Sequence, residues 1–237
     1  MFQNEILKNV LESIQRDPQN SAVVFDLDST LFCVTPRTQA IVNDLLLNVD
    51  LKQKFPTEMQ VLSNLQFYPT DWGLKQAMER THLPLSQNFI KSVRQHWSRH
   101  FFSNQYLDFD IIYPGADLFV QTVKKLGAEV FYLTGRQLDL MYEGTVKNLN
   151  RFQFPLSTNR HLNMKPPGHS SDEDFKTLWF KSEHQKYKNF WFFENEPVII
   201  EQVRVHTPSV KIVFVNSTHS GKAPAPQGLP SIGMEYR

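Results

Sequence analysis

The chain is poor in cysteine, in net charge and in long hydrophobic runs. Its one cysteine, Cys33, excludes an internal disulfide and is typical of a reducing compartment. The formal net charge of +1 argues against the basic surface that nucleic acids and anionic membranes attract. No apolar run approaches the length of a bilayer span, and the first residues lack the core of a signal peptide. We therefore expect a soluble, cytoplasmic protein that binds neither nucleic acid nor membrane, and its oligomeric state stays open.

Short apolar segments alternate with amphipathic helical patterns through much of the sequence. The chain has 237 residues, 41% of them hydrophobic, which suffices for one large domain or a domain with an insert. Strands are expected at 22–25, 129–133, 162–164, 190–193 and 210–215, and helices at 2–14, 116–126, 138–149 and 175–187. This alternation predicts an α/β fold, a Rossmann-like parallel sheet with helices on both faces. The segment 221–232, rich in proline and glycine, is expected to form a tail or a wrapping arm.

The segment 37–112 differs from the rest of the chain in its sequence pattern. Helical patterns are recognisable at 40–48, 58–65, 72–80 and 85–102, and no strand pattern interrupts them. We therefore expect a small helical domain at 37–112, inserted into a core made of 1–36 and 113–237.

Two carboxylates follow directly after the first expected strand. Asp26 and Asp28 stand two residues apart, where the apolar run 22–25 ends. Ligands of open α/β sheets bind at the carboxyl ends of the strands. Two carboxylates held close repel each other, so a cation lies between them or one of them keeps its proton. The alternative is a solvated acidic turn without chemistry.

Four segments, in one order along the chain, resemble the signatures of the haloacid dehalogenase-like (HAD) phosphohydrolases. They are Asp26-x-Asp28-x-Thr30, the segment 131–136 (FYLTGR), Asp172-x-Asp174-Phe175-Lys176, and the segment 192–197 (FFENEP). The resemblance implies a HAD-like core, with the helical insert 37–112 acting as a cap over the site. It also implies a phosphatase that acts on a small phosphorylated metabolite.

The resemblance assigns roles to the acidic residues. Asp26 would attack the phosphoryl group and form an aspartyl-phosphate, and Asp28 would act as general acid and base. A carboxylate with a raised pKa suits that alternation. Mg²⁺ is the implied cofactor, held by Asp26, Glu194 and the backbone carbonyl of Asp28. Asn195 and Glu196 are possible outer-shell residues, with Asn195 standing where many members of the family carry a second acid.

Phosphate binding is expected at Thr134, Gly135 and one lysine. The hydroxyl of Thr134 and the start of a following helix could both hold phosphate oxygens. The sequence around Lys176 resembles that of the family's lysine, so Lys176 is preferred over Lys165 and Lys181, which remain open.

Two alternatives to the phosphatase stay open at this point. A phosphomutase of the same fold would retain the phosphoryl group instead of transferring it to water. A catalytically weak relative would use the pocket for phosphate binding or regulation, which Asn195 favours and the intact pair Asp26 and Asp28 disfavours.

Overall fold

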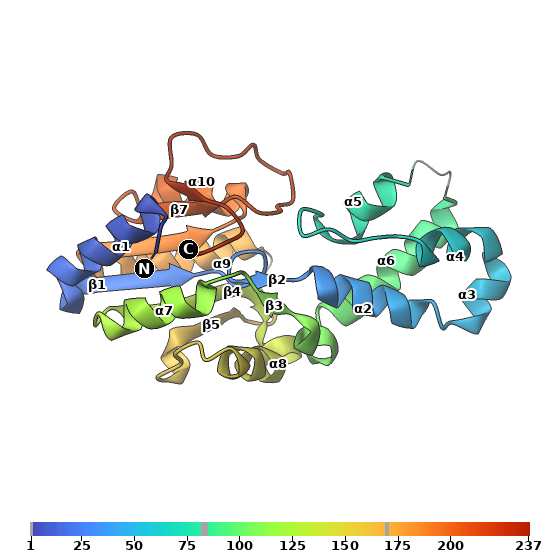
Figure 1. Cartoon of the computed structure of the whole chain (residues 1–237), viewed down its shortest axis with the longest axis horizontal. Coiled ribbons are helices and arrows are strands. Elements are labelled where there is room, and N and C mark those ends of the chain that lie inside the picture. The colour runs from blue at the N-terminus through green and yellow to red at the C-terminus, as the bar shows by residue number, and fades with distance from the viewer. Residues whose placement is uncertain (1, 82–84, 169–170) are drawn as a thin grey trace.

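A parallel β-sheet forms the centre of the molecule (Figure 1). The computed structural model describes residues 2–81, 85–168 and 171–237. In this described part the sheet has six strands in the order β5-β4-β1-β6-β7-β8. The strands are Ser21–Phe25 (β1), Glu129–Gln137 (β4), Leu162–Lys165 (β5), Asn189–Glu194 (β6), Lys211–Val215 (β7) and Ser231–Ile232 (β8). Every neighbouring pair is parallel, which confirms the predicted Rossmann-like α/β fold.

Helices cover both faces of this sheet. The helices of the sheet domain are Glu5–Arg16 (α1), Ala116–Lys125 (α7), Leu138–Arg151 (α8), Asp172–Glu183 (α9) and Pro197–His206 (α10). Side chains alternate along β1, so Val23 and Phe25 pack with α1, α7 and α8, whereas Ala22 and Val24 pack with α9 and α10. Because both faces are covered, β1 is buried along its whole length. No helix within the described chain combines the length and the apolarity needed to cross a membrane.

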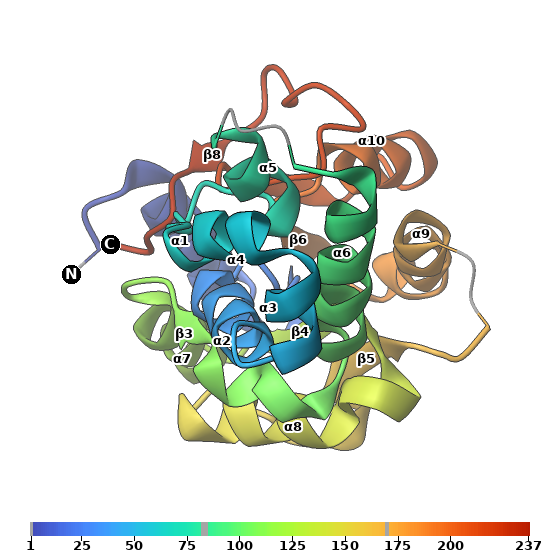
Figure 2. The ribbon, with the colours of Figure 1, turned by 90° about the vertical axis from the view of Figure 1, so that its right-hand side faces the viewer.

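The segment between β1 and α7 forms a helical lobe beyond the carboxyl end of β1 (Figures 1 and 2). Its helices are Thr35–Leu45 (α2), Val49–Lys54 (α3), Pro56–Ser63 (α4), Gly73–Glu79 (α5) and Gln87–Phe101 (α6). They enclose an apolar cluster of their own, which includes Leu45, Met59, Leu74 and Phe89. We call this lobe, residues 35–110, the insert.

The ends of the insert differ from the predicted boundaries at 37 and 112. Helix α2 begins at Thr35, two residues before the predicted boundary of the insert and five residues before the helical pattern predicted at 40–48. Strand β2 (Phe32–Cys33) pairs antiparallel with β3 (Ile111–Ile112), although no strand was predicted within 37–112. Strands of two residues are too short to show a hydrophobic period, which explains why the sequence pattern missed them.

The segment 221–232, for which we expected a tail or a wrapping arm, is mostly exposed and irregular up to residue 230 but ends in a strand of the sheet. Strand β8 extends the sheet next to β7. Tyr236 is fully buried, and its hydroxyl donates a hydrogen bond of 3.1 Å to the carbonyl of Thr30. Gly115, with φ +81°, lets Tyr236 approach, since a Cβ there would lie 2.3 Å from the carbonyl oxygen of Tyr236.

Candidate active site

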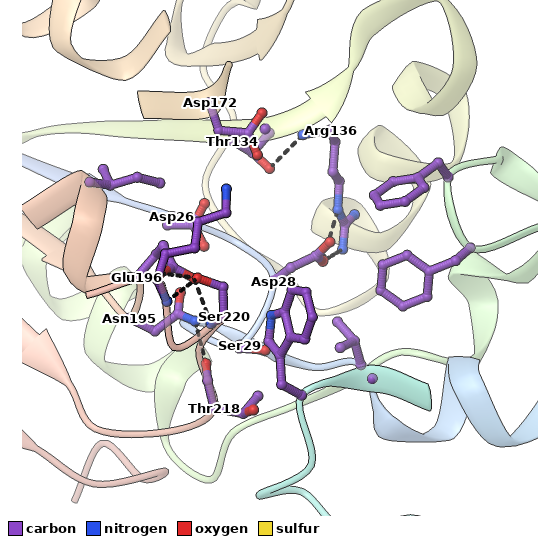
Figure 3. A pocket seen from close by; sticks show the side chains of 18 of the residues that line it. Asp26, Asp28, Ser29, Thr134, Arg136, Asp172, Asn195, Glu196, Thr218 and Ser220 are labelled. Atoms are coloured by element: carbon purple, nitrogen blue, oxygen red, sulfur yellow. Dashed lines mark hydrogen bonds and ion pairs between the residues drawn. The ribbon is translucent and has the colours of Figure 1, made fainter. Parts of the chain in front are cut away.

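Three polar side chains lie at the carboxyl edge of neighbouring strands, and Figure 3 shows two of them, Asp26 and Thr134. Asp26 directly follows β1, Thr134 lies in β4, and Glu194 is the last residue of β6. Because β1 lies between β4 and β6, these residues come together at one edge of the sheet. All three are buried, and they line a cavity of about 760 Å³ that extends toward the insert.

Lys176 joins the two acids of this edge. Its Nζ atom lies 2.5 Å from Oδ1 of Asp26 and 2.7 Å from Oε2 of Glu194. Burial opposes the charge on Lys176, but the two carboxylates outweigh it and raise the pKa of the lysine. Burial raises the pKa of Asp26, and it raises the pKa of Glu194 to about 7. One lysine thus faces two carboxylates, so a further cation would be favourable here.

The donor chemistry of this edge fits Mg²⁺. This ion prefers oxygen ligands and commonly takes one or two protein carboxylates together with phosphate and water. Oε1 of Glu194 accepts hydrogen bonds of 2.9 Å from the backbone N–H groups of Asn195 and Glu196, which orient the carboxylate. The described residues contain no group of three or more His, Cys, Asp and Glu side chains that could hold a metal. Asp26 and Glu194 are the carboxylates of this edge that could supply oxygen ligands to such an ion.

Asp28 belongs to a second cluster of charges. It accepts hydrogen bonds from Nη2 of Arg37 at 2.9 Å and from Nε of Arg136 at 3.0 Å. Both arginines also bind Asp110, with Nε of Arg37 at 2.8 Å and Nη2 of Arg136 at 2.9 Å. Arg37 and Asp110 are completely buried. We call these four residues the arginine–aspartate network, in which every charge faces two opposite charges.

This network overturns the expectation of a raised pKa at Asp28. Burial raises the pKa of Asp28, but the guanidinium groups of Arg136 and Arg37 outweigh it and hold the pKa well below its ordinary value. Asp28 is therefore ionised in this arrangement, and the two arginines disfavour the neutral form that it would need as a general acid and would become as a general base. The expectation failed because it considered only the repulsion from Asp26.

The backbone around Thr134 also differs from its prediction. Strand β4 does not end there but continues to Gln137, with a shift in its register against β5 after Thr134. Helix α8 begins only at Leu138, so Thr134 does not stand at the start of a helix. Its hydroxyl accepts a 3.2 Å hydrogen bond from the backbone N–H of Arg136 (Figure 3). The Thr134 hydroxyl thus lines the cavity without the helix N-terminus that we expected beside it.

Gly135 allows a charged pair to approach this strand. A Cβ at position 135 would lie 2.2 Å from Oδ2 of Asp172, so a larger residue would displace that carboxylate. Asp172 accepts a 2.5 Å hydrogen bond from Nζ of Lys165, and both line the cavity. Lys181 is exposed and is not among the residues that line it. Of the three candidate lysines, Lys176 is the one in contact with Asp26.

Asn195 and Glu196 approach Glu194 through their backbones and not through their side chains. The side chain of Asn195 bridges Oγ1 of Thr30, at 3.0 Å, and the carbonyl of Thr218, at 2.6 Å. The carboxylate of Glu196 accepts hydrogen bonds from the backbone and the hydroxyl of Ser220 (Figure 3). Both side chains therefore hold the loops around the cavity in place.

Sequence reasoning missed Arg37 and Asp110 and gave Arg136 no role. Arg136 was visible in the FYLTGR segment, but nothing local showed which acid it binds. Arg37 lies in the first helix of the insert, α2, and Asp110 lies at the end of the insert, 73 residues further along the chain. The available signal for this pair was the presence of an arginine and an aspartate near the two ends of one inserted segment.

Comparisons with known proteins support the fold. No protein-family model and no curated protein sequence matches the chain. A solved "predicted phosphoglycolate phosphatase" from Haemophilus somnus is 14% identical, with a TM-score of 0.52, over 92% of this chain and 95% of that one. A haloacid dehalogenase-like hydrolase from Streptococcus pneumoniae is 12% identical, with a TM-score of 0.50, over 84% and 86% of the two chains. The chain therefore has the HAD-like fold that the sequence motifs predicted.

Proposed function

We propose that the protein is a magnesium-dependent phosphatase that hydrolyses a small phosphomonoester through an aspartyl-phosphate on Asp26. The observation that carries the proposal is the contact of Asp26 with the buried Lys176, both of which line the cavity. A carboxylate there is oriented for attack, and a fixed cation beside it can stabilise the charge of a transferring phosphoryl group. The printed names of the two similar structures, a hydrolase and a predicted phosphatase, support the same class of reaction.

The first step would form a bond between an oxygen of Asp26 and phosphorus, while the bond from phosphorus to the leaving oxygen breaks. Lys176 would hold the charge of the phosphoryl oxygens, and the Thr134 hydroxyl would donate to one of them. Asp26, Glu194 and the Asp28 backbone carbonyl would hold Mg²⁺, which when bound screens the phosphate charge from the attacking carboxylate.

The second step would transfer the phosphoryl group from Asp26 to water. Asp28, ionised beside Arg37 and Arg136, would accept the proton that the attacking water loses. Asp28 would return this proton to the leaving oxygen in the first step of the next turnover. Both transfers pass through the neutral form of Asp28, which the arginines oppose, so proton transfer through Asp28 is the event that this arrangement favours least.

The test is phosphate release from p-nitrophenyl phosphate by the wild-type protein and by Asp26→Asn. We expect release with added Mg²⁺ and little with EDTA, since the ion would screen the phosphate charge. Asp26→Asn should lose at least two decades in rate, because an amide cannot attack phosphorus. As a matched control, Asp50→Asn changes an exposed residue of α3 and should keep wild-type turnover. Turnover by Asp26→Asn at the wild-type rate would exclude Asp26 as the nucleophile.

A further inference from the structure

The part of the cavity that lies within the insert has aromatic walls. Trp72, Trp97, Phe101 and Phe102 all line it, and we call these four residues the aromatic wall. The rings of Trp97 and Phe101 are stacked, with centroids 4.5 Å apart, and Phe102 packs edge-on against Phe101 at 5.1 Å. Trp72 is 41% exposed and Phe102 47%, so large apolar surfaces stay uncovered where a ligand could reach them.

Specific contacts hold this wall in place. The indole Nε1 of Trp97 donates a 3.2 Å hydrogen bond to the hydroxyl of Thr38. Gly73, with φ +58°, lies against the same indole, and a Cβ there would be 3.2 Å from its ring. Within the described residues, Trp72 has no ring partner of its own. The turn that carries Trp72 is thus packed on Trp97 while the Trp72 side chain stays available.

The aromatic wall begins close to the reacting groups. The guanidinium of Arg37 lies 4.4 Å from the centre of the Phe101 ring and also binds Asp28 at 2.9 Å. A single side chain therefore separates the wall from Asp28. A substrate whose phosphate reaches Asp26 would place its leaving group along these rings.

The rim of the same region is cationic. Lys75 and Arg94 line the cavity beside the aromatic wall. Lys75 has only a distant, exposed partner in Glu79, at 3.9 Å, and Arg94 forms no ion pair within the described part of the chain. Cationic side chains next to apolar rings suit a flat ring that carries polar substituents.

We infer that the leaving group of the substrate carries a flat aromatic ring with polar substituents, as in a nucleoside monophosphate or an aryl phosphate. This inference rests on the proposed phosphatase function. Stacking of one such ring on an aromatic side chain is worth roughly 5- to 150-fold in affinity. The cavity, at about 760 Å³, is in the size range of small-molecule sites.

The test compares three phosphomonoesters: adenosine 5′-monophosphate, O-phosphotyrosine and the ringless ribose 5-phosphate. We expect the wild-type protein to prefer at least one ring-bearing ester over ribose 5-phosphate by about tenfold in kcat/KM. Trp72→Leu should reduce that preference by about tenfold, mainly through KM, because stacking contributes to binding. The ring-bearing ester whose kcat/KM falls more in Trp72→Leu shows whether the ring belongs to a nucleoside or to an aryl group.

The control is Leu47→Ala, which changes a side chain of the insert that is 72% exposed and is not among the cavity-lining residues. It should leave all three kcat/KM values unchanged. Equal losses on all three esters in Trp72→Leu, or a wild-type preference for ribose 5-phosphate, would overturn the inference.

Failure of the proposed function gives a different result. The protein would then release no phosphate from any ester, including p-nitrophenyl phosphate with Mg²⁺. In that case calorimetric binding of the two ring-bearing esters decides the inference. Binding that Trp72→Leu weakens about tenfold supports it, and binding that is absent or insensitive to Trp72→Leu contradicts it.

Discussion

Replacing Asp110 by asparagine should destabilise the protein strongly without changing the shape of the side chain. The wild-type network holds two guanidinium groups, Arg37 and Arg136, and two carboxylates, Asp28 and Asp110. Asp110→Asn removes one negative charge and leaves two buried arginines to share Asp28. The arginines are 0% and 1% exposed at their side chains, so water cannot replace the lost partner.

The size of the effect follows from this burial. Removing one partner of a buried ion pair typically costs about 3–5 kcal/mol, because the other charge stays desolvated and uncompensated. For a chain of this length, each kcal/mol corresponds to roughly 2–4 °C in melting temperature. Asp110→Asn should therefore lower the melting temperature by roughly 6–20 °C.

Asp108→Asn is the matched control for this measurement. Asp108 precedes Asp110 by two residues, and its carboxylate pairs with Lys147 at the surface, where the two side chains are 50% and 65% exposed. An exposed pair of this kind contributes about 0–1 kcal/mol, so the control should melt within a few degrees of the wild type. Calorimetry or circular dichroism of both variants gives the comparison. Equal melting temperatures for Asp110→Asn and Asp108→Asn would refute the role we assign to the network.

Two further predictions concern other charged residues. Lys176→Ala should reduce kcat by roughly two to three decades, because it removes a buried cation beside Asp26. The control Lys181→Ala should leave kcat unchanged. Equal losses of kcat in both variants would contradict our choice of Lys176 as the lysine of the site. Burial raises the pKa of Glu129, but a 2.5 Å hydrogen bond with His161 and nearby cations outweigh it and keep the pKa below its ordinary value of 4.5. A lowered pKa stabilises the fold above the ordinary value and loses this effect as the pH falls. Glu129→Gln should therefore cost under about 1 kcal/mol near pH 7, and this cost should shrink as the pH falls below 4.5, as urea unfolding at a series of pH values would show. A cost that does not change with pH would argue against the pairing.

The sequence by itself determined the sheet and the acids at its edge. The strand Ser21–Phe25 contains the uninterrupted apolar run 22–25, because both of its faces are buried, and such runs are recognisable without a structure. Parallel strands place their carboxyl ends on one edge, so the fold prediction alone brings Asp26 and Glu194 together. Lys176 was preferred for its resemblance to a family motif, and the structure places it against both acids.

Only the tertiary structure decided the surroundings of Asp28. Its partners Arg37 and Arg136 lie nine and 108 residues away, and Asp110 binds both of them from the far end of the insert. Hydrophobic periodicity reports which face of an element is buried, but it carries no information on which charges meet across the fold. The direction of a pKa shift depends on which charges lie close together in the fold. The expectation of a raised pKa at Asp28 was wrong for that reason.

The short strands and the aromatic wall were also beyond the reach of sequence patterns. Strand β8 has two residues, and its pairing with β7 depends on the path of the whole C-terminal segment. Trp72 and Trp97 lie on separate elements of the insert, and their common cavity exists only once α5 and α6 have packed. Local patterns determine which segments become helices and strands, whereas the charges and rings that share a site are decided by long-range packing.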